Sequence, residues 1–160
     1  MEVEYIPYSS TWQAMEDLQR AGLTRNIGVS NINVQHLAEI WSYAQIKPVC
    51  NQVEVHPYLV QSQLLEFCQS LGVKVVAFSP LGSSSYVELG AVIAPGDSAL
   101  EQPLIAKIAQ AHKKSPAQII LRWGVQRGCS VITKSSKLER IAEGRDILHF
   151  ELTAEEVSVV

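Results

Sequence analysis

The sequence contains no apolar run of the roughly 18 residues that a membrane-spanning helix needs. Its first ten residues, MEVEYIPYSS, lack both the basic end and the apolar block of a secretory signal peptide. Basic residues are also few, with 13 Lys and Arg against 16 Asp and Glu, so the charge does not favour nucleic-acid binding. These absences predict a cytoplasmic protein that binds neither membrane nor nucleic acid.

Cysteine is scarce as well. Cys50, Cys68 and Cys129 are odd in number, far apart in the chain and flanked by apolar residues. This pattern favours reduced core thiols over disulfide or metal partners. Because no Cys/His pair has the spacing of zinc ligands, we expect no metal site.

What the sequence does contain is enough apolar material for a core. Hydrophobic residues make up 47% of the 160 positions and charged residues 18%, which is typical of a globular protein. Neither a linker nor a low-complexity segment interrupts the chain. We therefore expect one domain over residues 1–160.

Apolar periodicity and capping residues predict an alternation of helices and strands. Thr11 can cap a first helix with Trp12, Met15 and Leu18 on one face, and Gly22 can end it. Asn33 and Ser115 can cap two later helices, and Thr153 with Glu156 forms a capping box. The remaining helices are predicted over 62–72, 103–113 and 137–144, and the strands over 26–31, 49–55, 73–78 and 129–133.

The strand over 73–78 reads VKVVAF, a nearly continuous apolar run of the kind that is buried on both faces. Strands that alternate with helices favour a parallel sheet with helical crossovers. A Rossmann sheet is one candidate, but no strand is followed by G-x-G-x-x-G. The other is a TIM-type (β/α)8 barrel, of which four parallel strands with helices would be about half.

In such a barrel the polar residues that follow each strand gather at one end. Ser30, Asn31 and Gln52 supply both donors and acceptors, as a carboxamide requires. Phe78 offers a flat face for ring stacking, and the loop SPLGSSS offers amides and hydroxyls for a pyrophosphate. Lys134 and Arg140 supply cations suited to phosphate oxygens.

Each of these features also has a plainer interpretation. Ser30 and Asn31 could form a helix-capping turn, Gln52 could be a satisfied core amide, and Phe78 could belong to the core. Lys134 and Arg140 could be a solvated helix start, although two cations at a helix N-terminus are unfavourable unless an anion lies between them. The order of all these features along the chain favours the nucleotide-binding interpretation.

Three motifs in this order carry a family resemblance. Met15, Arg25 and IGVSN, then NQVEVHPY, then VITKSSKLERIAE, resemble the C-terminal half of an aldo-keto reductase from about Thr11 onward. SYVEL and LRWGVQRG lean toward the xylose/aldose reductase branch. The resemblance implies a partial barrel, truncated at both ends, from an NADPH-dependent enzyme that reduces aldehydes, ketones or aldose sugars.

The resemblance also implies roles for individual residues. Ser30, Asn31 and Gln52 would bind the nicotinamide carboxamide, and Phe78 would take a stacking position that is usually Tyr. The pyrophosphate would be lined by Ser79, Leu81 and Ser83. The 2′-phosphate, which distinguishes NADP(H) from NAD, would bind Lys134, Ser135, Ser136 and Arg140, with Glu143 at the adenine or ribose edge.

The sequence departs from the family's pattern at a few positions. Thr133 stands where Pro is usual, Ile32 replaces a common aromatic residue, and Gly144 stands where an Asn next to the adenine is usual. Loss of that side-chain contact, at ~1 kcal/mol for an ordinary hydrogen bond, would weaken cofactor binding several-fold.

The family's catalytic Asp, Tyr, Lys and His match no position of these 160 residues, so we expect no catalytic residue and no turnover by this chain alone. His56 is the most tempting substitute, but its place in NQVEVHPY favours packing or hydrogen bonding. An alternative is a non-catalytic NADP-binding half-barrel that acts as a sensor or interaction subunit. Four parallel strands leave two bare edges, which a second copy or a complementary N-terminal half could cover.

Overall fold

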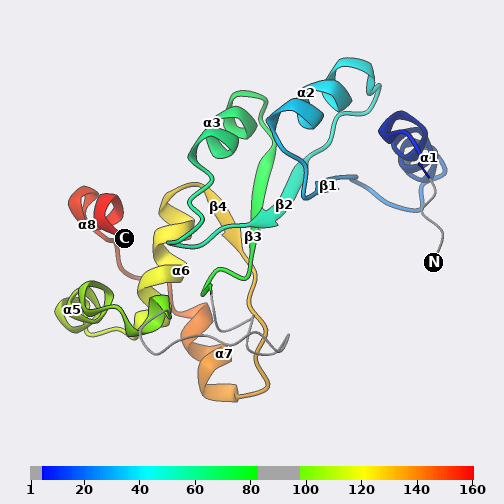
Figure 1. Ribbon diagram of the computed structural model, residues 1–160. Coiled ribbons are helices and arrows are strands. Elements are labelled where there is room, and N and C mark those ends of the chain that lie inside the picture. The colour runs from blue at the N-terminus through cyan, green and yellow to red at the C-terminus, as the bar shows by residue number, and fades with distance from the viewer. Residues whose placement is uncertain (1–4, 83–97) are drawn as a thin grey trace. The chain divides into compact units, whose positions relative to one another are not determined.

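The computed structural model describes residues 5–82 and 98–160 (Figure 1). Its elements follow the predicted order. The strands within the described residues are β1 (Val29–Ser30), β2 (Cys50–Glu54), β3 (Lys74–Phe78) and β4 (Cys129–Val131). The helices are α1 (Tyr8–Arg20), α2 (Val34–Tyr43), α3 (Ser62–Ser70), η1 (Ala99–Glu101), α5 (Pro103–His112), α6 (Pro116–Gln126), α7 (Leu138–Arg145) and α8 (Ala154–Val159).

The described strands form one sheet in the order β1-β2-β3-β4, so strands that follow one another in the chain are also neighbours in the sheet. β1 and β2 pair in parallel, with Val29 opposite Asn51 and Ser30 opposite Gln52. Helical crossovers between parallel neighbours are the arrangement of a (β/α)8 barrel, which confirms the predicted fold class.

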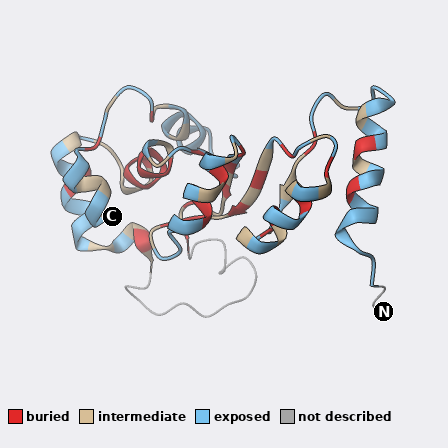
Figure 2. Ribbon diagram, turned by 90° about the horizontal axis from the view of Figure 1, so that it is seen from above, coloured by how far each residue is buried: buried red, intermediate tan, exposed pale blue. Residues whose placement is uncertain are grey.

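The chain divides into two compact units, which are described separately. The first consists of residues 1–53 and 62–75, and the second of residues 54–61 and 76–160. Figure 2 shows buried positions in both.

In the first unit, α1 begins at Tyr8, three residues before the predicted Thr11 cap. That cap is wrong, because Pro7 occupies the N-cap and its ring favours the start of a helix. The buried face consists of Trp12 and Glu16, whereas Leu18 is exposed, contrary to the prediction. Gly22 ends the helix at a φ of 72°, as expected for a left-handed C-terminal position.

The predicted cap of α2 is confirmed. The Asn33 side chain accepts a hydrogen bond from the His36 amide at 2.9 Å. Leu37, Ile40 and Ala44 are buried against the rest of the first unit, whereas Ala38, predicted on the same face, is exposed. The core of this unit also includes Ile27, Ile32, Val53, Leu64, Leu65, Cys68, Val73 and Val75.

The second unit is built around α6. The predicted capping box is present, since Ser115 Oγ accepts from the Gln118 amide and Gln118 Oε1 accepts from the Ser115 amide. Seven consecutive residues, 118–124, are buried, so this helix is covered on every side. A Cβ at Gly124 would lie 2.9 Å from Val131 Cγ1, which shows how closely α6 approaches β4.

The prediction that β3 is buried on both faces is wrong. Val75 and Ala77 are buried, whereas Val76 and Phe78 are half-buried and Lys74 is exposed. Successive side chains of a strand point to opposite faces, so the described residues cover only one face of β3 completely. An apolar run without alternation therefore does not by itself show that both faces are covered.

All three cysteines are free thiols, as predicted, although Cys50 is only half-buried. In the described ranges, no helix has both the length and the apolar character needed to cross a bilayer. Over the same ranges, no group of three or more His, Cys, Asp or Glu is arranged to hold a metal ion.

Candidate functional site

The first group of candidate residues lies where β1 ends, beside β2. Asn31 has a φ of 57°, a left-handed conformation that Asn adopts more readily than most residues. The Gln52 carbonyl oxygen accepts two hydrogen bonds at 2.9 Å, one from the Asn31 amide and one from Ser30 Oγ. The structure thus brings Ser30, Asn31 and Gln52 together within the first unit.

These contacts decide two of the plainer interpretations. The cap of α2 is Asn33, so Ser30 and Asn31 are not a capping turn. The Gln52 side chain is half-buried and has no hydrogen-bond partner among the described residues, so it is not a satisfied core amide. An amide and a hydroxyl side by side can donate to a carboxamide oxygen and accept from its N–H groups.

The second group follows β3. Ser79 has a φ of 46°, and its carbonyl accepts the Gly82 amide at 2.9 Å, which closes a tight turn over residues 79–82. Phe78, directly before the turn, and Leu81, within it, are both half-buried. Ser83 lies outside the described residues.

This turn lies on His56. A Cβ at Gly82 would be 3.6 Å from the Cγ and Nδ1 atoms of the His56 ring. The ring is 5% exposed, its Nδ1 accepts the Tyr58 amide at 3.2 Å, and its Nε2 lies 3.4 Å from Glu54 Oε1. Burial lowers the pKa of His56, and the nearby Glu54 carboxylate offsets this only in part. His56 is thus a buried, hydrogen-bonded residue, as the sequence favoured.

The third group lies between β4 and the first turns of α7. Lys134 and Arg140 are exposed, and Arg140 has no polar partner within the described part of the chain. Lys137 is the N-cap of α7 but caps no amide with its side chain, whereas Ser135 Oγ accepts the Lys137 amide at 3.1 Å. Three cations at a helix N-terminus provide an electropositive surface suited to an anion.

The remaining candidates of this group, Ser136 and Glu143, differ in whether they contact the rest of the second unit. Ser136 is exposed on the same loop. Glu143 Oε2 accepts a hydrogen bond from Ser115 Oγ at 3.3 Å, which ties part of the carboxylate to the cap of α6. Gly144 faces Thr133, whose Oγ1 would be 3.7 Å from an added Cβ. Two of the three departures from the family's pattern, Thr133 and Gly144, are therefore neighbours in space.

Comparison with known proteins decides the family. The sequence pattern that defines the Aldo/keto reductase family matches residues 3–160. The chain belongs to this family. An aldo-keto reductase from Bombyx mori, solved in complex with NADP, is similar to this chain with a TM-score of 0.89 and 41% identity, covering 97% of this chain and 50% of that one.

Two curated relatives show how widely named functions vary at this similarity. The NAD(P)H-dependent D-xylose reductase of Scheffersomyces stipitis is 45% identical over 152 residues, which cover 94% of this chain and 48% of that protein. Prostaglandin F synthase 1 of Bos taurus is also 45% identical over 152 residues, covering 94% of this chain and 46% of that protein. This aldo-keto reductase chain thus spans about half the length of the curated relatives it matches.

Sequence reasoning missed one residue beside the first group. Asn51 is 0% exposed, and its Nδ2 donates to the Ile32 carbonyl at 2.7 Å, one residue after Asn31. A polar residue at a position that shares the buried face of β2 with Val53 is the signal that could have found it.

Proposed function

We propose that this chain is the cofactor-binding half of an NADPH-dependent aldo-keto reductase that reduces aldehydes, ketones or aldose sugars. The observation that carries the proposal is the chemistry of two groups of residues. A hydroxyl and a side-chain amide, on Ser30 and Gln52, fit a carboxamide. The exposed cations of the β4–α7 segment fit a phosphate.

The family's relatives support the same cofactor. The Scheffersomyces stipitis relative is named for NAD(P)H dependence, and the Bombyx mori structure contains NADP. When bound, the dihydronicotinamide would supply a hydride to the carbonyl carbon. The residues assigned to this chain would orient its carboxamide, support its ring at Phe78, and hold the pyrophosphate at Ser79 and Leu81.

Discrimination between NADPH and NADH tests the proposal. We expect fluorescence titration to show tighter binding of NADPH, because only NADPH presents a 2′-phosphate to the cations. Lys134→Ala and Arg140→Ala should each weaken the binding of NADPH roughly tenfold, in the range of a hydrogen bond to a charged group. The affinity for NADH should not change. Lys107→Ala, on α5, is the control for the loss of one positive charge elsewhere. Equal affinity of the parent chain for both cofactors would refute the 2′-phosphate assignment.

We further propose that a second (β/α) half completes the barrel, either another copy of the chain or a complementary N-terminal half. The observation is that β1 and β4 are the two ends of the described sheet. Size-exclusion chromatography with light scattering distinguishes a self-associated species from a monomer. The three free thiols favour a reducing compartment, and we propose the cytoplasm.

A further inference from the structure

The buried face of β2 contains one residue whose side chain is costly to bury. Asn51 is completely inaccessible, on the same face of the strand as Val53, which is 3% exposed. An amide that leaves water loses its hydrogen bonds to solvent unless the protein replaces them. The partners of Asn51 therefore indicate what the residue does.

One half of the Asn51 amide has a good partner. Its Nδ2 donates to the Ile32 carbonyl at 2.7 Å. Because a carbonyl oxygen can only accept, the amide nitrogen and not the oxygen must face it. Ile32 directly follows Asn31, whose backbone is left-handed with a φ of 57°.

The other half of the amide is poorly satisfied. Asn51 Oδ1 has no hydrogen bond of good geometry from any described residue. The nearby Cys68 thiol is fully buried, and burial raises its pKa, although the Asn51 side chain lowers it in part. An apolar residue in place of Asn51 would remove this unpaired oxygen but would leave the Ile32 carbonyl without its donor, so the bond to Ile32 is what the amide contributes.

The contact to Ile32 completes a three-point attachment of the turn to β2. Ser30 Oγ and the Asn31 amide both donate to the Gln52 carbonyl, and the Asn51 side chain, on the buried face of the strand, donates to the carbonyl of the next residue, Ile32. Since the Gln52 carbonyl already accepts two bonds, a ligand carboxamide must meet the Ser30 oxygen and the Asn31 and Gln52 side chains instead.

We infer that Asn51 is a positioning residue that holds the Ser30–Asn31 turn in the conformation that binds the nicotinamide carboxamide. This inference depends on the proposed function for its ligand. Asn51 itself does not touch the cofactor; it acts through the Ile32 carbonyl.

Asn51→Leu, which keeps the number and branching of the side-chain heavy atoms and removes the donor, tests the inference with two fragments of the cofactor. Reduced nicotinamide mononucleotide reports the carboxamide end, and 2′,5′-ADP reports the phosphate end. We expect the variant to weaken the binding of the mononucleotide and of NADPH roughly fivefold, which corresponds to the loss of one ordinary hydrogen bond. Its affinity for 2′,5′-ADP should not change. Asn51→Asp should restore binding at low pH, where the protonated carboxyl can donate to Ile32.

Val53→Ala is the matched control, because it removes buried volume from the same face of the same strand without touching the turn. It should lower the stability and leave mononucleotide binding unchanged. Equal weakening of the mononucleotide and 2′,5′-ADP by Asn51→Leu would mean a general structural defect and would overturn the inference, as would unchanged mononucleotide binding.

Hydrogen exchange separates this inference from the proposed function, because it needs no nucleotide. In Asn51→Leu the Asn31 amide should exchange faster, while the Lys74 amide, which donates to the Val49 carbonyl, should not change. Unchanged exchange at Asn31 would overturn the inference. A parent chain that binds neither NADPH nor either fragment would overturn the proposed function, and with it the ligand assigned to this turn.

Discussion

At the scale of single residues, backbone atoms arrange the candidate site as much as side chains do. The Gln52 carbonyl fixes the Ser30–Asn31 turn, and the Ser79 carbonyl closes the turn at Gly82. Apart from the bond from Ser30 Oγ, these contacts join backbone atoms, which a sequence motif does not display. The motifs identify the segments, and the hydrogen bonds determine which atoms remain available to a ligand.

Gly144 gives a prediction at this scale. A Cβ there would make only an ordinary contact with Thr133 Oγ1 at 3.7 Å, so a side chain fits. Gly144→Asn should tighten NADPH binding several-fold by restoring a hydrogen bond worth ~1 kcal/mol. Gly144→Ala controls for the gain in helix propensity alone and should leave the affinity unchanged. If both variants bind NADPH equally to the parent, position 144 does not contact the cofactor.

His56 gives a second prediction, on pH. Its pKa is lowered by burial, so the native state binds this proton less readily than the unfolded state does. Above the unfolded pKa of about 6.5 both states are neutral and the residue adds no pH dependence. As the pH falls below this value, the free energy of unfolding should decrease.

Urea unfolding between pH 7.5 and 5 measures this decrease. His56→Asn keeps an acceptor for the Tyr58 amide but cannot be protonated, so its unfolding free energy should vary less with pH. A variant with the same pH dependence as the parent would show that His56 does not contribute.

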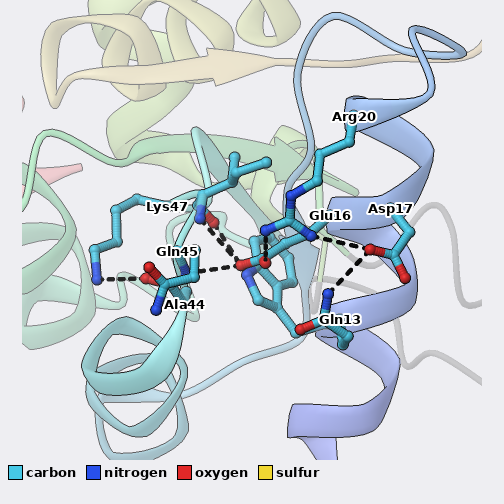
Figure 3. Close-up of polar contacts among 9 residues, drawn as sticks. Gln13, Glu16, Asp17, Arg20, Ala44, Gln45 and Lys47 are labelled. Atoms are coloured by element: carbon cyan, nitrogen blue, oxygen red, sulfur yellow. Dashed lines mark hydrogen bonds and ion pairs between the residues drawn. The ribbon is translucent and has the colours of Figure 1, made fainter.

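At the scale of elements, α1 is anchored by a buried carboxylate. Glu16 is 2% exposed, and its Oε1 accepts the Gln45 and Ile46 amides at 2.8 and 3.0 Å, while Oε2 accepts from Arg20 at 2.7 Å (Figure 3). Trp12 Nε1 adds a bond to the Ile46 carbonyl at 3.0 Å. These contacts connect α1 to the segment between α2 and β2 within the first unit.

Acid should therefore loosen α1. Burial alone would raise the Glu16 pKa, but the hydrogen bonds from Ile46, Arg20 and Gln45 outweigh it and lower the pKa. A carboxylate with a depressed native pKa contributes stability that is present above its unfolded value of about 4.5 and is lost as the pH falls through the native value. The protection of the α1 amides, measured relative to their intrinsic exchange rate at each pH, should fall below pH 4.5.

Glu16→Gln should lower the stability at pH 7, because an amide cannot accept from Arg20 as a charged group does, by about 1–3 kcal/mol for a hydrogen bond to a charged group. Asp17→Asn, on the exposed side of the same helix, is the control and should change the stability little. A Glu16→Gln chain as stable as the parent across the acid range would contradict this role.

Of the three scales, the helices and strands were the most predictable from the sequence. Caps such as Asn33, Ser115 and Thr153 are local, so their residues determine where the helices begin. The predicted Thr11 cap was wrong because Pro7 occupies the N-cap of α1. The predicted placement of Leu18 on the apolar face was wrong because the buried face of α1 consists of Trp12 and Glu16. The anchoring of Ile32 by Asn51 was out of reach, because it joins residues 19 positions apart.

At the scale of the whole molecule, the described strands form a four-stranded sheet with two free ends. In a complete (β/α)8 barrel of the kind found in the aldo-keto reductase family, further strands close such a sheet on itself. Ser30, Gln52 and Lys134 were predicted as site residues because a barrel places the residues that follow its strands at one end, and their roles stay a prediction. The coverage of β3 was not predictable, since it depends on which other elements are present.

The open sheet gives a prediction for the 160-residue chain alone. As an isolated monomer it should unfold over a broad temperature range, because four strands leave edges and apolar surface uncovered. Thermal unfolding by circular dichroism, with calorimetry on the same sample, measures the cooperativity. A sharp two-state transition of a monodisperse monomer would contradict this expectation.

The chain alone should also bind NADPH without turnover, because none of its residues matches the family's catalytic Asp, Tyr, Lys and His. Absorbance at the dihydronicotinamide band measures NADPH consumption with D-xylose or an aldehyde. Substrate-dependent oxidation above the rate without protein would show that these 160 residues contain a catalytic group.

The most direct test of the proposed function is to record the amide spectrum of the ¹⁵N-labelled chain during titration with NADP⁺. We expect saturable shifts at Ser30, Asn31 and Gln52 and at 134–136 and Arg140, with one dissociation constant for both groups. NAD⁺ should shift the 134–136 segment far less. Shifts in only one group, or dissociation constants that differ between the groups, would contradict the claim that these residues bind one phosphorylated dinucleotide.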